Sequence, residues 1–136
     1  MPVILTRNTT ITSDALNTLR MESWADMGPS DWDPVFSRSM GWVCAYKSER
    51  LVGFVNVAWD GGAHAFLLDT TVHRDFKRRG IGTELVREAT ALAREGGAEW
   101  LHVDYDETDA ALEPFYCGCG FVSTPAGVIH LEPYVE

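Results

Sequence analysis

The stretch HRDFKRRGIGTE, His73–Glu84, carries four of the chain's eleven basic residues, Arg74, Lys77, Arg78 and Arg79. The chain as a whole is acidic, with a formal net charge of −9 at pH 7. Two glycines, Gly80 and Gly82, stand where a strand-like apolar pattern gives way to a helical one. The sequence therefore gathers positive charge at a predicted strand-to-helix junction, and this junction decides how we interpret the fold.

Phosphate binding is one explanation of the junction. The first N–H groups of a helix have no partner inside the helix, and the helix dipole adds positive potential there. Glycine lets the backbone approach a ligand closely, and such a helix start binds phosphate. The alternative is a solvated charged face, which explains most charge runs. Because basic side chains oppose the dipole at a helix start, a bound anion is the better explanation.

Two common phosphate loops are excluded. A P-loop requires G-x-x-x-x-G-K-[ST], and the chain contains no Gly-Lys pair. A dinucleotide fingerprint requires G-x-G-x-x-G, and Leu85 stands at the third glycine position. The sequence therefore predicts a phosphate compound held by a different fold.

The composition is that of one globular domain, and we expect residues 1–136 to form it. A pI near 4.8 disfavours nucleic acid or an anionic membrane as a partner. No apolar run approaches the roughly 20 residues of a membrane helix. The first ten residues lack the pattern of a signal peptide, so we expect a cytoplasmic protein.

The three cysteines, Cys44, Cys117 and Cys119, are too few and odd in number for a disulfide framework. Cys117 and Cys119 form C-x-C without a second ligand pair, so we expect no metal site. No Cys/His/Asn arrangement indicates a thiol nucleophile.

Periodicity and turn residues predict a β-α-α-β-β-β-α-β-α-β-β order, which is typical of a mixed sheet with helices on its faces. The hairpin turns lie at 48–50 and 60–62. The predicted strands cover 3–7, three segments within 42–73, and 98–105, 120–124 and 127–132. The predicted helices cover Asp14–Trp24, Pro34–Met40, Gly80–Glu95 and 109–119, and the third buries the stripe Ile81, Leu85, Ala89, Leu92 and Ala93.

Two motifs resemble the GNAT superfamily of N-acetyltransferases. The family signature Q/R-x-x-G-x-G/A follows a strand that ends in Val, and Val72 and Lys77–Gly82 match it, with Lys77 in place of Gln or Arg. An aromatic-Tyr pair before Gly-Phe matches FYCGCGF, Phe115–Phe121. The resemblance implies an α/β (mixed) fold, with a mostly antiparallel central sheet of about seven strands flanked by about four helices.

The resemblance also implies acetyl-coenzyme A (acetyl-CoA) as the donor. Its pyrophosphate would lie on the backbone of Arg78–Thr83, and its pantetheine arm would add to the strand edge near Thr71–His73. Asp109 stands where many family members carry Asn at the start of the last helix. The cofactor-binding residues predicted in this way are Thr71, Val72, His73, Lys77, Arg78, Arg79, Gly80, Ile81, Gly82, Thr83, Asp109 and Phe115.

Tyr116 matches the family's general-acid tyrosine, which protonates the leaving thiolate. A core tyrosine on an amphipathic helix would produce the same spacing. A backbone N–H near Val72 would stabilise the tetrahedral oxyanion. For the base, Asp69, His102 and Asp104 remain open, and the polar strip Trp100, His102, Asp104 and Asp106 also fits a strand face in water.

Aromatic and acidic residues mix in the segment ESWADMGPSDWDPVF, which suits an ammonium ligand, although a solvated loop held by aromatic packing explains it slightly better. These are Trp24, Trp32 and Phe36 with Glu22, Asp26, Asp31 and Asp33. We therefore expect an enzyme that acetylates a small amine or a peptide amine. A noncatalytic acyl-CoA-binding or sensor module on the same fold is the alternative. Because the family often dimerises, the resemblance also implies a homodimer.

Overall fold

The computed structural model describes residues 2–23 and 29–132, and the chain divides into two compact units. The N-terminal unit covers Met1–Asp104 and the C-terminal unit covers Tyr105–Glu136. Each unit is described by itself below.

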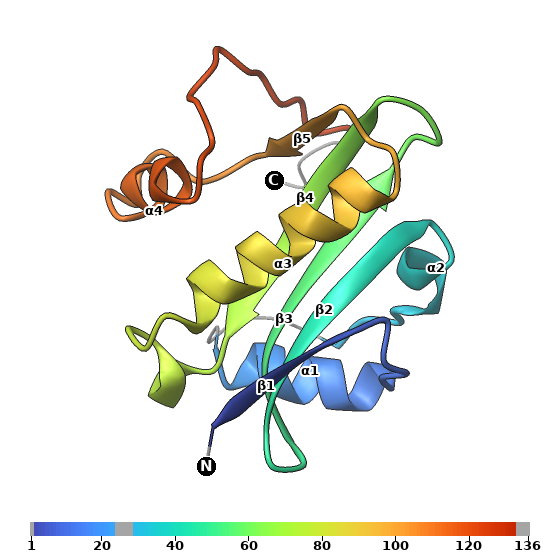
Figure 1. Ribbon diagram of the computed structural model, residues 1–136, viewed down its shortest axis with the longest axis vertical. Coiled ribbons are helices and arrows are strands. Elements are labelled where there is room, and N and C mark those ends of the chain that lie inside the picture. Colours follow the sequence, from blue (N-terminus) through green and yellow to red (C-terminus); the bar gives the residue numbers. More distant parts are fainter. Residues whose placement is uncertain (1, 24–28, 133–136) are drawn as a thin grey trace. The chain divides into compact units, whose positions relative to one another are not determined.

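The N-terminal unit is built on a five-stranded sheet in the order β1-β2-β3-β4-β5 (Figure 1). The first four strands pair antiparallel with their neighbours, and β5 runs parallel to β4. This confirms the predicted mixed, mostly antiparallel sheet and both predicted hairpin turns. The strands are β1 (Val3–Arg7), β2 (Ser39–Lys47), β3 (Arg50–Trp59), β4 (His64–Val72) and β5 (Trp100–Val103).

Four α-helices and one 3₁₀ turn complete the described chain, which confirms the predicted helix number. Thr12 starts the first helix, because its hydroxyl accepts a hydrogen bond from the N–H of Ala15 at 3.0 Å. Pro114 falls in the first turn of the last helix, where proline costs no internal hydrogen bond. The elements are α1 (Ser13–Met21), α2 (Asp33–Phe36), η1 (Arg74–Phe76), α3 (Ile81–Glu95) and α4 (Leu112–Gly118).

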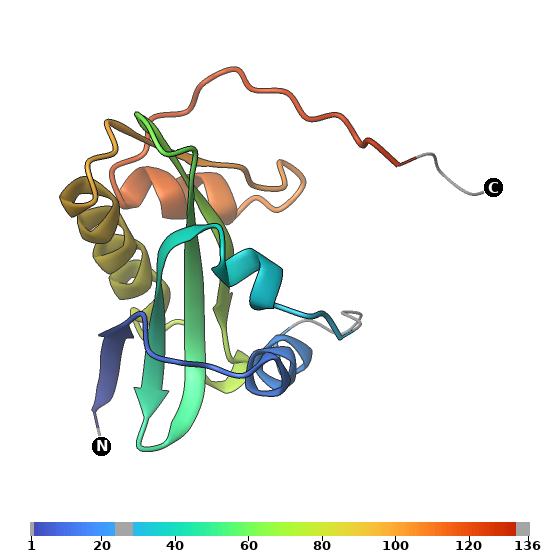
Figure 2. The ribbon, with the colours of Figure 1, turned by 90° about the vertical axis from the view of Figure 1, so that its right-hand side faces the viewer.

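Helices cover both faces of the sheet, with α3 on one face and α1 and α2 on the other (Figure 2). All five residues of the stripe predicted for α3 are buried. Gly53 of β3 lets α3 come close, because a Cβ there would lie 2.9 Å from Leu85 Cδ1 and 3.1 Å from Ala45 Cβ.

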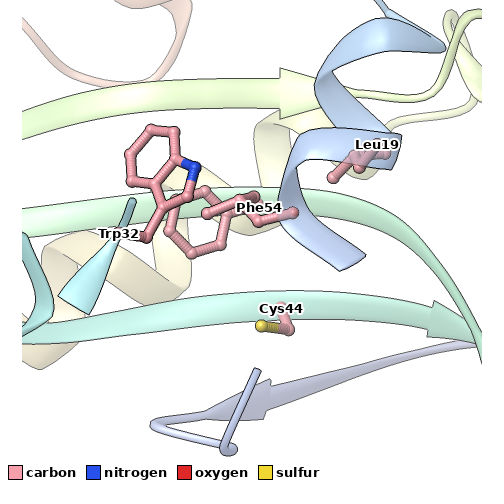
Figure 3. Packing of buried hydrophobic residues seen from close by; sticks show 5 residues of the cluster. Leu19, Trp32, Cys44 and Phe54 are labelled. Atoms are coloured by element: carbon pink, nitrogen blue, oxygen red, sulfur yellow. The ribbon is translucent and has the colours of Figure 1, made fainter. Parts of the chain in front are cut away.

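The face beneath α1 and α2 is closed by an apolar cluster, in which Trp32 and Phe54 lie together between the helix and the strands (Figure 3). The rings of Trp32 and Phe54 meet edge to face at 6.3 Å. The cluster contains Leu16, Leu19, Trp32, Cys44 and Phe54, each no more than 3% exposed. Both faces of the sheet therefore carry a packed core.

Two predicted strands are wrong, because the described residues between 120 and 132 contain no strand. Their apolar side chains Val122, Val128, Ile129 and Leu131 are 79–87% exposed. Apolar alternation predicts a strand only where a neighbouring edge supplies the hydrogen bonds, and no such pairing forms within the described chain.

Several boundaries also differ from the prediction. The second helix ends at Phe36, since Ser39 and Met40 already pair within β2. The first helix ends at Met21, and the predicted end at Trp24 lies outside the described residues. β5 is shorter than the predicted 98–105, and α4 begins at Leu112 rather than at residue 109.

Candidate active site

The turn from β4 into α3 has an irregular backbone. Arg78 has φ +64° and Gly80 has φ +81°, both in the left-handed region. Gly80 is the N-cap of α3, and no side chain caps the helix. Left-handed backbone costs a residue other than glycine roughly 1–2 kcal/mol, so Arg78 is held there by its surroundings. The first N–H groups of α3 are consequently presented by a shaped turn without a protein cap.

Basic side chains from three elements gather on this turn. The ring of Phe76, which is buried, has Arg79 at 5.0 Å, Lys47 at 5.3 Å and Arg50 at 5.9 Å from its centroid. Lys77, Arg78 and Arg79 are exposed. The sequence prediction missed Lys47 and Arg50, although their antiparallel pairing across the β2–β3 turn offered a signal. The positive charge of the turn is thus larger than the sequence motif alone indicates.

Strand β4 changes its pairing halfway along its length. Residues His64–Leu67 pair with β5, whereas 68–72 have only β3 as a strand partner in the described chain. At the same point the register against β3 shifts, because Leu68 faces Asn56 and Thr71 faces Phe54. Asp69 and Thr70 form a bulge, and Asp69 has φ +60°. The half of β4 that leads into the basic turn therefore has one unpaired edge.

The predicted residues Thr71, Val72 and His73 form the end of this half. The Thr71 hydroxyl is buried and donates to the carbonyl of Asp69 at 2.9 Å. The imidazole of His73 is only 2% exposed, and its Nδ1 accepts from the N–H of Asp75 at 3.0 Å. The side chain of His73 thus supports the start of η1. Its backbone is also engaged, since its N–H donates to the Val52 carbonyl and its carbonyl accepts from the Phe76 N–H, each at 2.8 Å.

A carboxylate of α1's C-terminal end ties that helix to this region. Glu22 Oε2 lies 3.2 Å from His73 Nε2 and accepts from Arg50 at 3.1 Å. The Glu22 carbonyl also accepts from Arg74 Nε at 2.8 Å. Burial raises the pKa of Glu22, but the hydrogen bonds of His73 and Arg50 outweigh burial, so this pKa lies below its ordinary value.

The three candidate bases have different surroundings. Burial raises the pKa of the Asp69 carboxyl, and the charge of Arg20 partly opposes this shift. Asp69 nevertheless remains an exposed residue of β4. His102 is exposed, its Nε2 lies 2.8 Å from His64 Nδ1, and its ring stacks on Phe66 at 5.0 Å. Asp104 is exposed at the end of the N-terminal unit.

The C-terminal unit holds Tyr116 inside an aromatic cluster. Its ring is 7% exposed, stacks on Tyr105 at 5.3 Å and meets Phe115 edge-on at 4.9 Å. Asp109 accepts a hydrogen bond from the N–H of Ala111 at 3.0 Å before α4 begins. Tyr116, Phe115 and Asp109 thus lie in one unit, and the other predicted site residues lie in the N-terminal unit.

The predicted acceptor segment is partly structural. Trp32 belongs to the apolar cluster, and its indole N–H donates to Asn17 Oδ1 at 3.0 Å. Phe36 packs on Trp42 at 4.4 Å. Asp31 and Asp33 are exposed, whereas Trp24 and Asp26 lie outside the described residues. Packing therefore explains the two described aromatic side chains of this segment.

The described residues carry neither a metal-ligand cluster nor a membrane-spanning helix. In the chain as described, no group of three or more His, Cys, Asp or Glu side chains could hold a metal ion. Cys44, Cys117 and Cys119 are free thiols. None of the helices that the structure describes is both long and apolar enough to span a bilayer.

Comparison with known proteins gives consistent matches. The family model described as Acetyltransferase (GNAT) family matches residues 11–121. An uncharacterized N-acetyltransferase, ycf52, from Porphyra purpurea is 31% identical over 82 residues, which are 60% of this chain. The chain spans only 45% of the length of that relative.

Two solved structures share the fold. A GNAT-family acetyltransferase from Streptococcus pneumoniae has a TM-score of 0.79 and 21% identity, with 96% of this chain and 100% of that chain covered. AAC(6')-Iy in complex with the bisubstrate analog CoA-S-monomethyl-acetylneamine has a TM-score of 0.75 and 13% identity, with 98% and 100% covered. At these identities the two structures show the fold alone.

Proposed function

The chain belongs to the acetyltransferase (GNAT) family, and from this premise we propose that it moves an acetyl group from acetyl-CoA directly to a primary amine of a small molecule or peptide. The proposal treats residues 1–136 as one acetyltransferase domain, because the family match runs across the boundary after Asp104. The observation that carries the proposal is the uncapped start of α3 beneath a left-handed turn and a basic cluster.

The residues at this turn fit the phosphates of a coenzyme A thioester. The backbone N–H groups of Arg78–Thr83 would hold the pyrophosphate, with the helix dipole aligned to favour it. Lys77, Arg78 and Arg79 are exposed and can neutralise further phosphate charge. Lys47 and Arg50, which contact Phe76 beside Arg79, extend the same positive surface.

The unpaired edge of β4 fits the pantetheine arm. An extended amide chain adds to a free strand edge through main-chain hydrogen bonds. In β4 this edge covers residues 68–72 and leads directly to the turn. The strand would therefore align the arm with the phosphate site, and the thioester would come to lie along the bulged half of β4.

The chemical step needs an oxyanion donor and a proton for the leaving sulfur. A backbone N–H near Val72 would stabilise the oxyanion of the tetrahedral intermediate. We assign the proton to the hydroxyl of Tyr116, in line with the family's general-acid tyrosine. We take transfer to be direct, because the sequence offers no Cys/His/Asn arrangement for a thiol nucleophile. One of the similar structures carries an acetylneamine-containing analog, which supports a cationic amine as the acceptor class.

A thermal-shift titration tests donor binding. Acetyl-CoA at about 100 times its dissociation constant adds roughly 2.7 kcal/mol to the native state, so the melting temperature should rise. Gly82→Trp places an indole at the start of α3 and should abolish this rise. An unchanged melting temperature at millimolar acetyl-CoA, with Gly82→Trp behaving like the parent, would contradict donor binding.

Thiol release from acetyl-CoA in the presence of an amine panel tests transfer. We expect at least one cationic amine to support release above the rate without amine. Donor binding without release by any amine would instead support the noncatalytic acyl-CoA-binding module.

A further inference from the structure

The bulge in β4 presents Asp69 in an unusual backbone conformation. Its φ of +60° lies in the left-handed region, where aspartate is one of the tolerated residues other than glycine. The bulge inserts an extra residue opposite β3 and re-aims a side chain that a regular strand would point elsewhere. The bulge begins two residues after Leu67, the last residue of β4 paired with β5. Asp69 therefore stands at the beginning of the unpaired edge.

The carboxylate of Asp69 has no hydrogen-bond donor among the described residues. The charged group that acts on it is Arg20, from the last turn of α1, whose charge lowers the carboxyl pKa. Asn56 and Phe54 of β3, which flank the bulge, carry no charge. Burial of the carboxyl raises its pKa, and this increases its affinity for a proton. Such a carboxylate is available to an incoming ammonium group.

The position along β4 suits a base. Asp69 and Val72 are three residues apart, so their Cα atoms lie at most about 10 Å apart at roughly 3.3 Å per residue. A side chain and an amine, or one intervening water, can span this distance. His102 is less suited, since it pairs with His64 and stacks on Phe66 in the half of β4 that β5 covers.

We propose that Asp69 is the general base that takes a proton from the acceptor's ammonium group, and this assignment rests on the acetyltransferase function proposed above. The carboxylate accepts the proton, and the freed nitrogen lone pair forms the C–N bond with the thioester carbonyl carbon. As the C–S bond breaks, the departing sulfur takes a proton from the general acid, which regains one from solvent. Asp69 then releases its proton to solvent, which leaves an amide and a free thiol.

The test compares Asp69→Asn with the matched control Glu99→Gln, which removes an exposed acid elsewhere in the N-terminal unit. The probes are spermidine, neamine and a lysine-containing peptide, and the readouts are the pH profile of kcat/KM, the affinity for acetyl-CoA and the melting temperature. For Asp69→Asn we expect kcat/KM near pH 7 to fall about 10²–10⁴-fold. The loss should shrink as pH rises, because more amine is then already unprotonated.

Donor affinity should stay unchanged in Asp69→Asn, and the melting temperature should stay equal or rise. Asparagine tolerates the left-handed backbone and removes a charge that burial disfavours. Asp69→Gly is the second variant, because glycine relaxes this backbone and removes the carboxylate. It should lose kcat/KM to a similar extent.

Three results are distinguishable. A parent-like pH profile in both Asp69 variants overturns the assignment while leaving the acetyltransferase function intact. A parallel fall in melting temperature, donor affinity and rate in both variants also overturns it, since that pattern belongs to a structural residue. Donor binding without turnover of any probe by the parent overturns the proposed function and the base together.

Discussion

The two halves of β4 share one strand but differ in every property that matters for binding. The half at His64–Leu67 has a strand on each side, regular register and alternating burial. The half at 68–72 has a bulge, a left-handed aspartate and one unpaired edge, and it leads into the basic turn. The regular half supports the sheet, whereas the irregular half leaves backbone groups and a carboxylate for a ligand.

The difference shows where this protein tolerates strain. Left-handed residues other than glycine persist only where the surrounding structure holds them. Two of them, Asp69 and Arg78, flank the end of β4 and the turn to α3. The network of Glu22, His73 and Arg50 ties the residue just after β4 to the end of α1 and the start of β3. We interpret this support as the means by which the open half keeps its shape.

The largest expected effect concerns the proposed proton donor, Tyr116. Tyr116→Phe keeps the ring stacked on Tyr105 and removes only the hydroxyl. Single-turnover acetyl transfer should slow about 10²–10⁴-fold, with donor affinity nearly unchanged. Tyr105→Phe, which removes the neighbouring hydroxyl that contacts Ser123, is the matched control and should keep the parent rate. An unaltered chemical step in Tyr116→Phe would show that the acid is another group.

Substitutions in the paired half of β4 should lower the free energy of unfolding and leave the affinity for the donor unchanged. Leu67 is 2% exposed, so Leu67→Ala should lower the free energy of unfolding by about 2–5 kcal/mol in urea titrations. Its neighbour Leu68 is 41% exposed, and Leu68→Ala should cost clearly less. Donor affinity of the folded Leu67→Ala protein should match the parent. A selective loss of donor binding in this variant would break the distinction between the two halves.

The stabilisation that Glu22 provides through His73 and Arg50 should depend on pH. Removing the charge in Glu22→Gln leaves buried His73 without its carboxylate partner, which costs roughly 1–3 kcal/mol at neutral pH. Because the folded-state pKa of Glu22 is lowered, its stabilisation is fully present above the ordinary value of 4.5. The stabilisation is lost as pH falls through the lower, folded-state pKa.

As pH falls, the free energies of unfolding of the parent and of Glu22→Gln should therefore approach each other. Urea titrations of both proteins between pH 7 and pH 3 would measure this approach. Glu49→Gln, an exposed change in the adjacent hairpin turn, is the control. A constant difference across this range would mean that the Glu22 charge contributes nothing to the support.

The smallest effect belongs to the exposed charges of the turn. Arg78→Ala combined with Arg79→Ala should weaken coenzyme A binding about 2- to 30-fold, the range expected for two exposed charge pairs. The loss should be greater at low salt, because salt screens exposed charges. Pantetheine, which lacks the nucleotide phosphates, should be much less sensitive in the same titrations. Equal sensitivity of both ligands would show that these arginines do not hold phosphate.

The regular parts of this fold were predictable because their signals are local. The stripe from Ile81 to Ala93 has the helical period, and Asp60-Gly61-Gly62 favours a hairpin by its own backbone preferences. The bulge was not predictable, since Asp69 stands in an apolar run without glycine. The alternating residues after Gly120 led to two wrongly predicted strands. A strand forms only where the edge of another strand pairs with it, and the alternation itself does not reveal such an edge.

The candidate site also contains residues that local sequence signals predicted and residues that they did not. The motif around Gly80 identified the turn from adjacent residues, but the approach of Lys47 and Arg50 to Phe76 arises only when the β2–β3 hairpin folds against η1. The burial of the His73 imidazole likewise depends on Glu22, which is 51 positions earlier in the numbering. Contacts between distant segments leave no period in the sequence.

Hydrogen exchange at single-amide resolution, with and without saturating acetyl-CoA, tests the central claim most directly. We predict that the donor slows exchange at the amides of residues 71–73 and 78–83, while 65–67 in the paired half keep their rates. Gly82→Trp should abolish the difference between the two conditions. Unchanged exchange at the turn in a parent protein that binds acetyl-CoA, or protection confined to the paired half of β4, would contradict the placement of the donor at the start of α3.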